Sequence, residues 1–136
     1  EILQAQEGPE MQIGLGYNNL SAVYVAMLDP EGALQSSNAA MQILSKYLGP
    51  DHEAIGTIEW DLGVMYADLQ DYQLAATHYL RAKEIFEKNF GPSYPQFPQL
   101  YHQYGECLDH LREYSEAGKW HLKAKEINLK SHGPLH

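Results

Sequence analysis

The fold is decided by the stretch Gln42-Ile43-Leu44-Ser45-Lys46-Tyr47-Leu48-Gly49-Pro50, because its pattern returns at a fixed spacing. An isoleucine followed six residues later by Gly-Pro occurs four times, and the spacings are 41, 42 and 42 residues between Ile2, Ile43, Ile85 and Ile127. A period of this length is typical of a solenoid, in which each unit buries its apolar face against its neighbours. We therefore expect binding along an extended surface rather than chemistry in a closed pocket.

Within each unit, the apolar residues follow a helical period. In the first unit, one helical face of large side chains consists of Tyr17, Leu20, Tyr24 and Leu28. A short turn and a second helix with small and aliphatic residues follow, and the same order returns in the next two units. The pattern predicts first helices near 10–28, 52–69 and 98–111, and second helices near 31–47, 73–89 and 115–131.

Small residues and turn residues mark the predicted helix contacts and helix ends. Antiparallel helices approach closely only where a side chain is small, and we assign this role to Ala33, Ala75 and Ala117. Asp29 is a candidate N-cap in front of Pro30, which suits the first turn of a helix. The glycines of the Gly-Pro pairs suit a left-handed residue directly after a helix, and the proline then prevents the helix from continuing.

Composition and charge exclude several classes of partner. Nine lysines and arginines stand against eighteen acidic residues, which gives a net charge of -9. Nucleic acid and anionic membranes require positive charge, so we expect a basic or neutral protein partner instead. The single cysteine, Cys107, is compatible with a reducing compartment, and we expect a cytoplasmic location. The chain has no apolar run of ~20 residues and no signal-peptide pattern at its start.

The second unit carries the residues that resemble a known repeat. Their spacing is similar to the signature of the tetratricopeptide repeat, and they are Leu62, Gly63, Tyr66, Ala75, Tyr79 and Ala82. The longer unit of this chain, with Leu-Gly-Pro-Asp-His at 48–52, resembles the repeats of kinesin light chains and their relatives, as does Asn18-Asn19-Leu20. The resemblance implies an all-α fold, a right-handed superhelical solenoid of antiparallel helix pairs.

The expected organisation is three repeats preceded by the end of another. The predicted parts are the end of a preceding repeat helix at 1–9, a first repeat at 10–50, a second at 51–92 and a third at 93–136. Intact solenoids usually carry atypical polar caps. None is visible, so we interpret the chain as a piece of a longer array.

Several residues depart from the signature of the family. Ser21 stands where glycine or alanine is usual, and Ser37 and His121 replace the aromatic residue of the second helix. Glu59 occupies the usual aromatic position of the first helix, and Trp60 follows it. We expect this shift to turn the tryptophan towards the inner surface.

In this family the first helices line the concave face, so the resemblance implies which residues form a peptide-binding groove. The candidates are Asn18, Asn19, Trp60, Asp61, Val64, Asp68, His102, Gln103, Glu106, Asp109 and His110. None of them is lysine or arginine. Family members that clamp a peptide carboxylate, and kinesin light chains that bind acidic cargo motifs, need positive charge here. We therefore expect basic or neutral peptides.

Two groups of candidates have alternative interpretations. The asparagines either hold a peptide backbone amide, which needs a donor and an acceptor on one side chain, or are simply solvated. Trp60 is either an anchor for the partner, as tryptophan often is at interfaces, or a core residue between repeats.

The histidines and the cysteine predict no catalytic or metal site. His102, Glu106 and His110 share a helix face, but they span ~12 Å along the axis, so one ion cannot reach all three. We interpret them as a polar groove wall that responds to pH. Cys107 is expected to be a small core residue. No nucleophile-base set stands at a recognisable spacing, so we expect neither an enzyme nor a cofactor.

The predicted function is protein-protein interaction, as a cargo or substrate adaptor or a scaffold within a larger protein. Two alternatives remain open. The chain is either a structural or oligomerisation segment whose groove is filled by its own or a second chain, or a regulatory domain of an enzyme whose catalytic part lies elsewhere. Fold alone does not decide among these roles.

Overall fold

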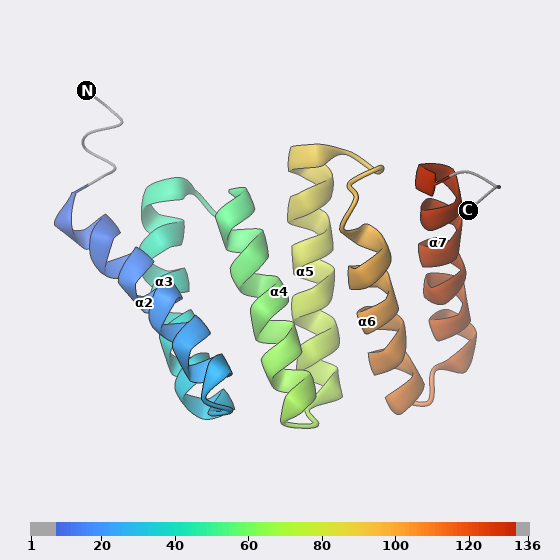
Figure 1. The fold of residues 1–136 in the computed structure, drawn as a ribbon, viewed down its shortest axis with the longest axis horizontal. Helices are drawn as coiled ribbons and strands as arrows, with labels where there is room; N and C mark the ends of the chain where they lie inside the picture. The colour runs from blue at the N-terminus through green and yellow to red at the C-terminus, as the bar shows by residue number, and fades with distance from the viewer. Residues whose placement is uncertain (1–7, 133–136) are drawn as a thin grey trace.

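The computed structural model describes residues 8–132 as a row of six α-helices (Figure 1). They are α2 (Pro9–Ala26), α3 (Pro30–Leu48), α4 (Glu53–Asp68), α5 (Tyr72–Phe90), α6 (Phe97–His110) and α7 (Tyr114–His132). Every end lies within two residues of the range predicted from the apolar period. The motif around Ile2, most of the helix end predicted at 1–9, and the pair Gly133-Pro134 lie outside the described residues.

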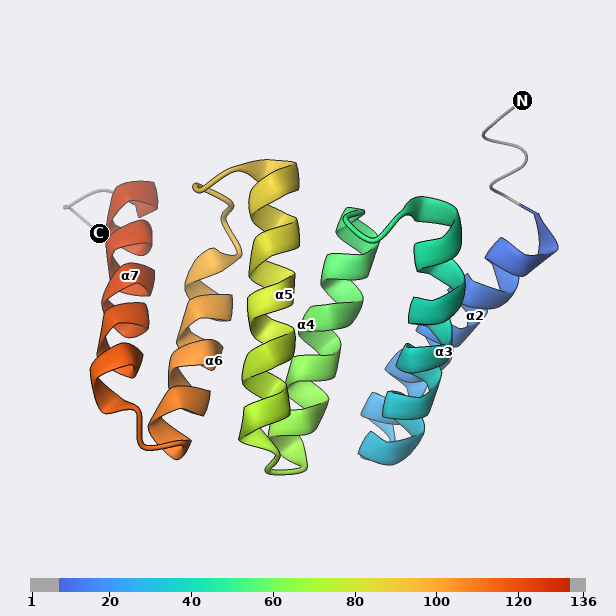
Figure 2. The same cartoon turned by 180° about the vertical axis from the view of Figure 1, so that it is seen from behind.

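The helices form antiparallel pairs that stack side by side. In Figure 1, α2 and α4 lie in front of α3 and α5, and Figure 2 gives the reverse order from behind. The stack continues from pair to pair because α3 packs against α4 and α5 packs against α6. This arrangement confirms the predicted all-α solenoid, in which α2, α4 and α6 are the first helices of their pairs and α3, α5 and α7 the second.

The turn within each pair uses a left-handed residue other than glycine. Leu28, Gln70 and Arg112 have φ values of 58°, 65° and 64° at equivalent positions. In the first turn, the N–H of Asp29 donates to the carbonyl of Tyr24 at 2.9 Å, which satisfies a carbonyl at the end of α2. The prediction that Leu28 lies on one helix face with Tyr17, Leu20 and Tyr24 is therefore wrong, because α2 ends at Ala26, and the Leu28 side chain is 88% exposed.

Glycine is required where one pair leads into the next. Gly49 has φ 88° and ψ 156°, and Gly91 has φ 80° and ψ -178°. The positive φ was predicted, but ψ is extended rather than left-handed helical, and this region of backbone conformation is essentially limited to glycine. Asp29 caps α3 as predicted, because its side chain accepts a hydrogen bond from the Gly32 N–H at 3.0 Å.

The departures from the family signature compensate for each other in volume. A Cβ atom at Gly63 would lie 2.6 Å from the Tyr79 ring, so this glycine makes room for an aromatic residue. In the first pair the equivalent residues are Ser21 and Ser37, whose hydroxyls are 2.6 Å apart and hydrogen-bonded. The two serines therefore replace a glycine and a ring without leaving a buried hydroxyl unpaired.

Two clusters of buried side chains hold the stack together. The first joins the α2/α3 pair to the α4/α5 pair and consists of Met11, Ala40, Leu44, Ile55, Ile58, Leu62 and Ile85. The second joins the α4/α5 pair to the α6/α7 pair and consists of Ala75, Ala76, Tyr79, Ala82, Phe86, Phe97, Leu100, Tyr101, Cys107 and Ala124. As predicted, Ala33, Ala75 and Ala117 are fully buried, which allows the helices of each pair to approach closely.

Candidate functional site

The first helices contain no lysine or arginine. Together they carry seven acidic residues, namely Glu10, Glu53, Glu59, Asp61, Asp68, Glu106 and Asp109. The lysines and arginines of the described chain all lie on the second helices, apart from Arg112 in the turn before α7. The charges of one layer add to a common potential, so the side formed by the first helices attracts cations.

Five of the predicted groove residues surround one pocket between α4 and α6. The pocket has a volume of about 260 Å³, and these five residues are Val64, Asp68, Gln103, Glu106 and His110. Its remaining lining comes from four residues that were not predicted to form part of the groove, namely Ala67, Tyr72, Tyr79 and Cys107. Tyr72 and Tyr79 belong to α5, so the pocket extends from the layer of first helices to a second helix.

Two contacts fix the position of polar groups at the pocket. The His110 ring stacks on the Tyr72 ring, with centroids 4.0 Å apart and planes 1° from parallel. The indole N–H of Trp60 donates a hydrogen bond of 2.6 Å to Oε1 of Gln103, which joins α4 to α6. These contacts hold the imidazole and the amide in place before any partner binds.

Trp60 lies at the boundary between the groove and the core. Its side chain is half-buried and makes an edge contact with Phe86, with ring centroids 6.0 Å apart. It also packs against the second buried cluster. Trp60 thus has the packing that one interpretation predicted. Whether its exposed part also anchors a partner remains a prediction.

Of the three residues predicted to form a polar wall, His102 and Glu106 belong to a chain of groups that crosses from α6 to α7, whereas His110 stacks on Tyr72 at the pocket. The Nδ1 atoms of His102 and His121 are 3.2 Å apart, so one ring donates to the other. Nε2 of His121 lies 3.2 Å from Oδ2 of Asp109, and Nε2 of His102 lies 3.7 Å from Oε2 of Glu106. These contacts link two imidazoles and two carboxylates across α6 and α7.

The other predicted groove residues lie apart from the pocket. Asp61 is on α4, where its surroundings reduce its hydration and raise the pKa of its carboxyl, although the side chain is exposed. Asn18 is half-buried and Asn19 is exposed on α2. Neither asparagine takes part in a side-chain hydrogen bond among those of the described residues, so both predicted roles remain open.

Glu59 has a structural role that the sequence did not predict. The Glu59 side chain is 3% exposed and accepts hydrogen bonds from Nδ1 of His78 at 2.6 Å and from Nε of Arg81. These partners come from α5, so the ion pair ties the two helices of the pair together. The acid at an aromatic position was visible in the sequence. Its partners were not, because they depend on how α5 faces α4.

The described residues offer little for catalysis. Burial is the main cause that raises the pKa of the Cys107 thiol to about 11, and Glu106 raises it further, so the nucleophilic thiolate is scarce at neutral pH. Within residues 8–132 there is no group of three histidine, cysteine or acidic residues that could hold a metal ion. No helix in this part of the chain is both long and apolar enough to cross a membrane.

Solved structures with a similar fold include two proteins. The crystal structure of BtubC (BKLC) from P. vanneervenii has a TM-score of 0.81 and 18% sequence identity over 94% of this chain. The crystal structure of MamA protein has a TM-score of 0.67 and 18% identity over 90% of this chain. The chain spans 50% of the first protein and 59% of the second, and identity this low shows the fold alone.

Sequence comparison supplies the family. No curated protein sequence matches the chain. The family model described as tetratricopeptide repeat matches residues 12–88, which is more than half of the chain and includes the signature residues of the second pair. The family is typically non-catalytic, and its repeats generally mediate protein-protein interaction. The antiparallel pairs, their period of 42 residues and this match lead to one conclusion: the chain belongs to the tetratricopeptide repeat family.

Proposed function

We propose that the chain is an adaptor or scaffold module that binds a basic or neutral peptide segment along the layer of α2, α4 and α6. The observation that carries this proposal is the absence of lysine and arginine from all three first helices, while they hold six exposed acids besides the buried Glu59. A peptide lying across these helices meets several carboxylates but no lysine or arginine from them, so a basic segment is favoured over an acidic one. We place this role in the cytoplasm, in keeping with a single buried cysteine that carries no disulfide.

The proposal predicts a sign and a salt dependence. On an array of short peptides matched in length and hydropathy but graded in net charge, binding should rise with positive charge. Raising the ionic strength from about 0.05 to 0.5 M should weaken that binding, because the Debye length shrinks from more than 10 Å to a few ångströms. Acidic peptides as the dominant binders would overturn the proposal.

Charge reversal on the binding layer tests the same point from the protein side. Asp61→Lys/Asp109→Lys should slow association of a basic peptide several-fold and change its dissociation rate less, because long-range attraction acts mainly on encounter. Glu84→Lys/Glu126→Lys, on the second helices, makes the same change in net charge and is the matched control. Equal effects from both variants would mean that net charge matters and the binding layer does not.

A second candidate role is self-assembly through α2. Its large side chains include Ile13, Leu20 and Val23, all exposed, and the exposed Met27 follows directly after the helix. A second copy that covers this face would bury apolar surface, as neighbouring pairs do within the chain. Sedimentation velocity over a wide concentration range distinguishes this role, because a monomer throughout contradicts it.

A further inference from the structure

The pocket between α4 and α6 combines carboxylates with an apolar wall. Asp68 on α4 and Glu106 on α6 supply one carboxylate from each side. Val64, Ala67 and Cys107 supply apolar surface between them. The volume of about 260 Å³ is enough for one long side chain, but is below the range usual for small-molecule sites.

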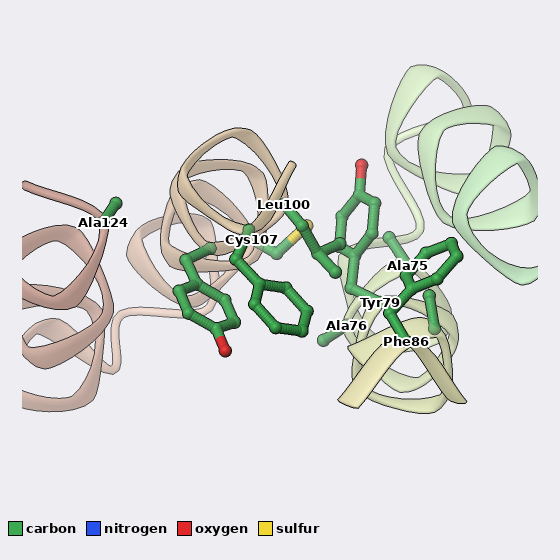
Figure 3. Close-up of a cluster of buried hydrophobic side chains, with 10 residues drawn as sticks. Ala75, Ala76, Tyr79, Phe86, Leu100, Cys107 and Ala124 are labelled. Carbon is green, nitrogen blue, oxygen red and sulfur yellow. The ribbon is translucent and has the colours of Figure 1, made fainter. Parts of the chain in front are cut away.

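A hydroxyl without a hydrogen-bond partner belongs to one of the residues that line the pocket. Tyr79 is 2% exposed, and its hydroxyl takes no part in the hydrogen bonds among the described residues. It is not sealed in the core, because every fully buried polar side-chain atom of the described residues has a hydrogen-bond partner. Tyr79 lines the pocket, and Figure 3 shows its hydroxyl directed away from Phe86 and Ala76. The hydroxyl therefore faces the space inside the pocket.

The surroundings of this hydroxyl are negative. Burial is the largest cause that raises the pKa of Tyr79, and Cys107, Asp68 and Glu106 raise it further. Tyr79 therefore stays protonated and neutral, and its oxygen can accept a hydrogen bond while its proton is donated to a neighbouring oxygen. Such a set of acceptors fits a group that carries several N–H donors and a positive charge.

We propose that this pocket takes a single basic side chain, lysine or arginine, from a peptide bound along the first helices, with its charged head at Asp68, Glu106 and the Tyr79 hydroxyl. The methylene stem lies against Val64, Ala67 and Cys107, as the stems of long basic residues commonly do on apolar surface. The inference rests on the proposed function for the peptide around this residue. It adds the pocket that recognises the basic residue of that peptide.

The charge of the occupant follows from the chemistry of the lining. An anionic side chain would meet two carboxylates, and the only basic side chain from α4 or α6 at the pocket is the His110 imidazole, which is stacked on Tyr72. A neutral apolar chain would leave both carboxylates and the hydroxyl without a partner, which costs binding energy once water is displaced. A basic head satisfies all three groups.

The direct test uses blocked amino acids on the full chain, so that no peptide sequence is assumed. N-acetyl-lysine methylamide and N-acetyl-arginine methylamide are titrated into the ¹⁵N-labelled protein and followed by NMR. Saturable shifts confined to amides around the pocket, such as those of Ala67, Gln103 and Cys107, are expected for at least one of the two. N-acetyl-norleucine methylamide has a stem without charge and should bind at least tenfold more weakly. Equal binding of norleucine, or shifts spread over the surface, would overturn the proposal.

Two double variants distinguish binding in the pocket from attraction by the overall negative potential of the first helices. Asp68→Asn/Glu106→Gln removes one charge from α4 and one from α6 inside the pocket, and should weaken binding of the blocked amino acid at least tenfold. Asp61→Asn/Asp109→Asn removes one charge from each of the same helices outside the pocket, and should weaken it no more than twofold. If both variants weaken binding equally, the pocket is not the site.

Tyr79→Phe distinguishes binding from packing. The ring stays in the core and only a hydroxyl without a protein partner is removed, so the melting temperature should not fall. Binding should still weaken threefold or more. Unchanged binding would remove the hydroxyl from the proposal. If Asp68→Asn/Glu106→Gln keeps the full preference for basic peptides, the pocket is not the site, but the proposed function stands. If the unmodified chain shows no preference for basic peptides, the proposed function itself is wrong.

Discussion

The two junctions between helix pairs are built from different kinds of side chain. At the aliphatic junction, where the α2/α3 pair meets the α4/α5 pair, the buried cluster contains no aromatic ring. At the aromatic junction, where the α4/α5 pair meets the α6/α7 pair, rings form a continuous series. Its ring centroids are 4.5 Å apart for Phe90 and Tyr94 and 5.4 Å apart for Tyr94 and Phe97. They are 5.0 Å apart both for Phe97 and Tyr101 and for Tyr101 and Trp120.

The difference indicates where the solenoid is held most firmly. Aromatic pairs contribute about 0.5–1.5 kcal/mol beyond the area that they bury, and a hydrogen bond between Trp60 and Gln103 crosses the same junction. The pocket between α4 and α6 lies at this junction, so its two walls are held in register. A site that must recognise one side chain gains from such preorganisation.

Alanine substitutions at three equivalent positions, one in each pair, compare how much buried side chains contribute to stability. Ile13, Ile55 and Phe97 stand 42 residues apart at the start of the first helices, and they are 53%, 1% and 0% exposed. Phe97→Ala should lower the free energy of unfolding by about 3–5 kcal/mol and Ile55→Ala by about 2–4 kcal/mol, because each leaves a cavity. Ile13→Ala should cost under about 0.5 kcal/mol, as at other exposed positions. Urea denaturation of the three variants checks this order.

Tryptophan fluorescence and circular dichroism together test whether the two junctions unfold separately. Trp60 and Trp120 both pack against the aromatic cluster, so tryptophan fluorescence reports that junction, whereas circular dichroism reports all helices. Because repeats can unfold separately, Ile55→Ala should lose part of its helical signal before its fluorescence changes. Coincident transitions in Ile55→Ala would mean that the two junctions unfold as one unit and that their difference has no thermodynamic consequence.

The sequence predicted those features of the fold that depend on interactions between residues close in the chain. Helices and their pairing follow from apolar periodicity and from small residues such as Ala75, which act locally or between sequence neighbours. The face assigned to Leu28 was wrong because one left-handed residue ended the helix early, and periodicity does not report backbone conformation. A non-glycine residue rarely signals such a turn.

The pocket was only half predictable for a similar reason. Its carboxylates lie on first helices, where the family resemblance places a groove. Tyr72 and Tyr79 come from a second helix, and the signature assigns Tyr79 only to packing. It reaches the pocket because Gly63 leaves room for its ring, a contact between residues on different helices. Such a contact depends on the packing angle of the helices, which the sequence pattern leaves undetermined.

A substitution at Gly63 tests whether the aromatic junction tolerates movement of Tyr79. Gly63→Ala places a methyl group 2.6 Å from the Tyr79 ring, which is only 2% exposed, so we expect a loss of about 1–3 kcal/mol in unfolding free energy. Gly16→Ala is the matched control, because nothing lies within 4 Å of its added Cβ in α2. There the higher helix propensity of alanine should stabilise the chain by up to ~1 kcal/mol. A stabilised Gly63→Ala would show that the ring moves freely.

The hydrogen bond across the aromatic junction should have a smaller effect. Trp60→Phe keeps an aromatic ring beside Phe86 but removes the N–H that donates to Gln103. We expect a loss of about 0.5–1.5 kcal/mol, the usual net contribution of one hydrogen bond. Trp60→Phe/Gln103→Leu removes both partners, and a double-mutant cycle gives the coupling between them. Zero coupling would leave the aromatic rings as the only difference between the junctions.

Alkaline pH should weaken the aromatic junction selectively. Burial raises the pKa of Cys107 from 9.0 to about 11 and that of Tyr101 to about 12, while the aliphatic cluster contains no titrating group. Above pH 9 the unfolded thiol loses its proton while the folded thiol keeps it, so the unfolded state binds fewer protons and stability falls as pH rises towards 11. Urea denaturation at pH 7 to 11 should show this fall, and Cys107→Ala should reduce its slope. Lysines titrate equally in both proteins and cancel in the difference. Identical slopes would mean that the thiol is solvated, and that the aromatic junction is looser around Cys107 than its packing indicates.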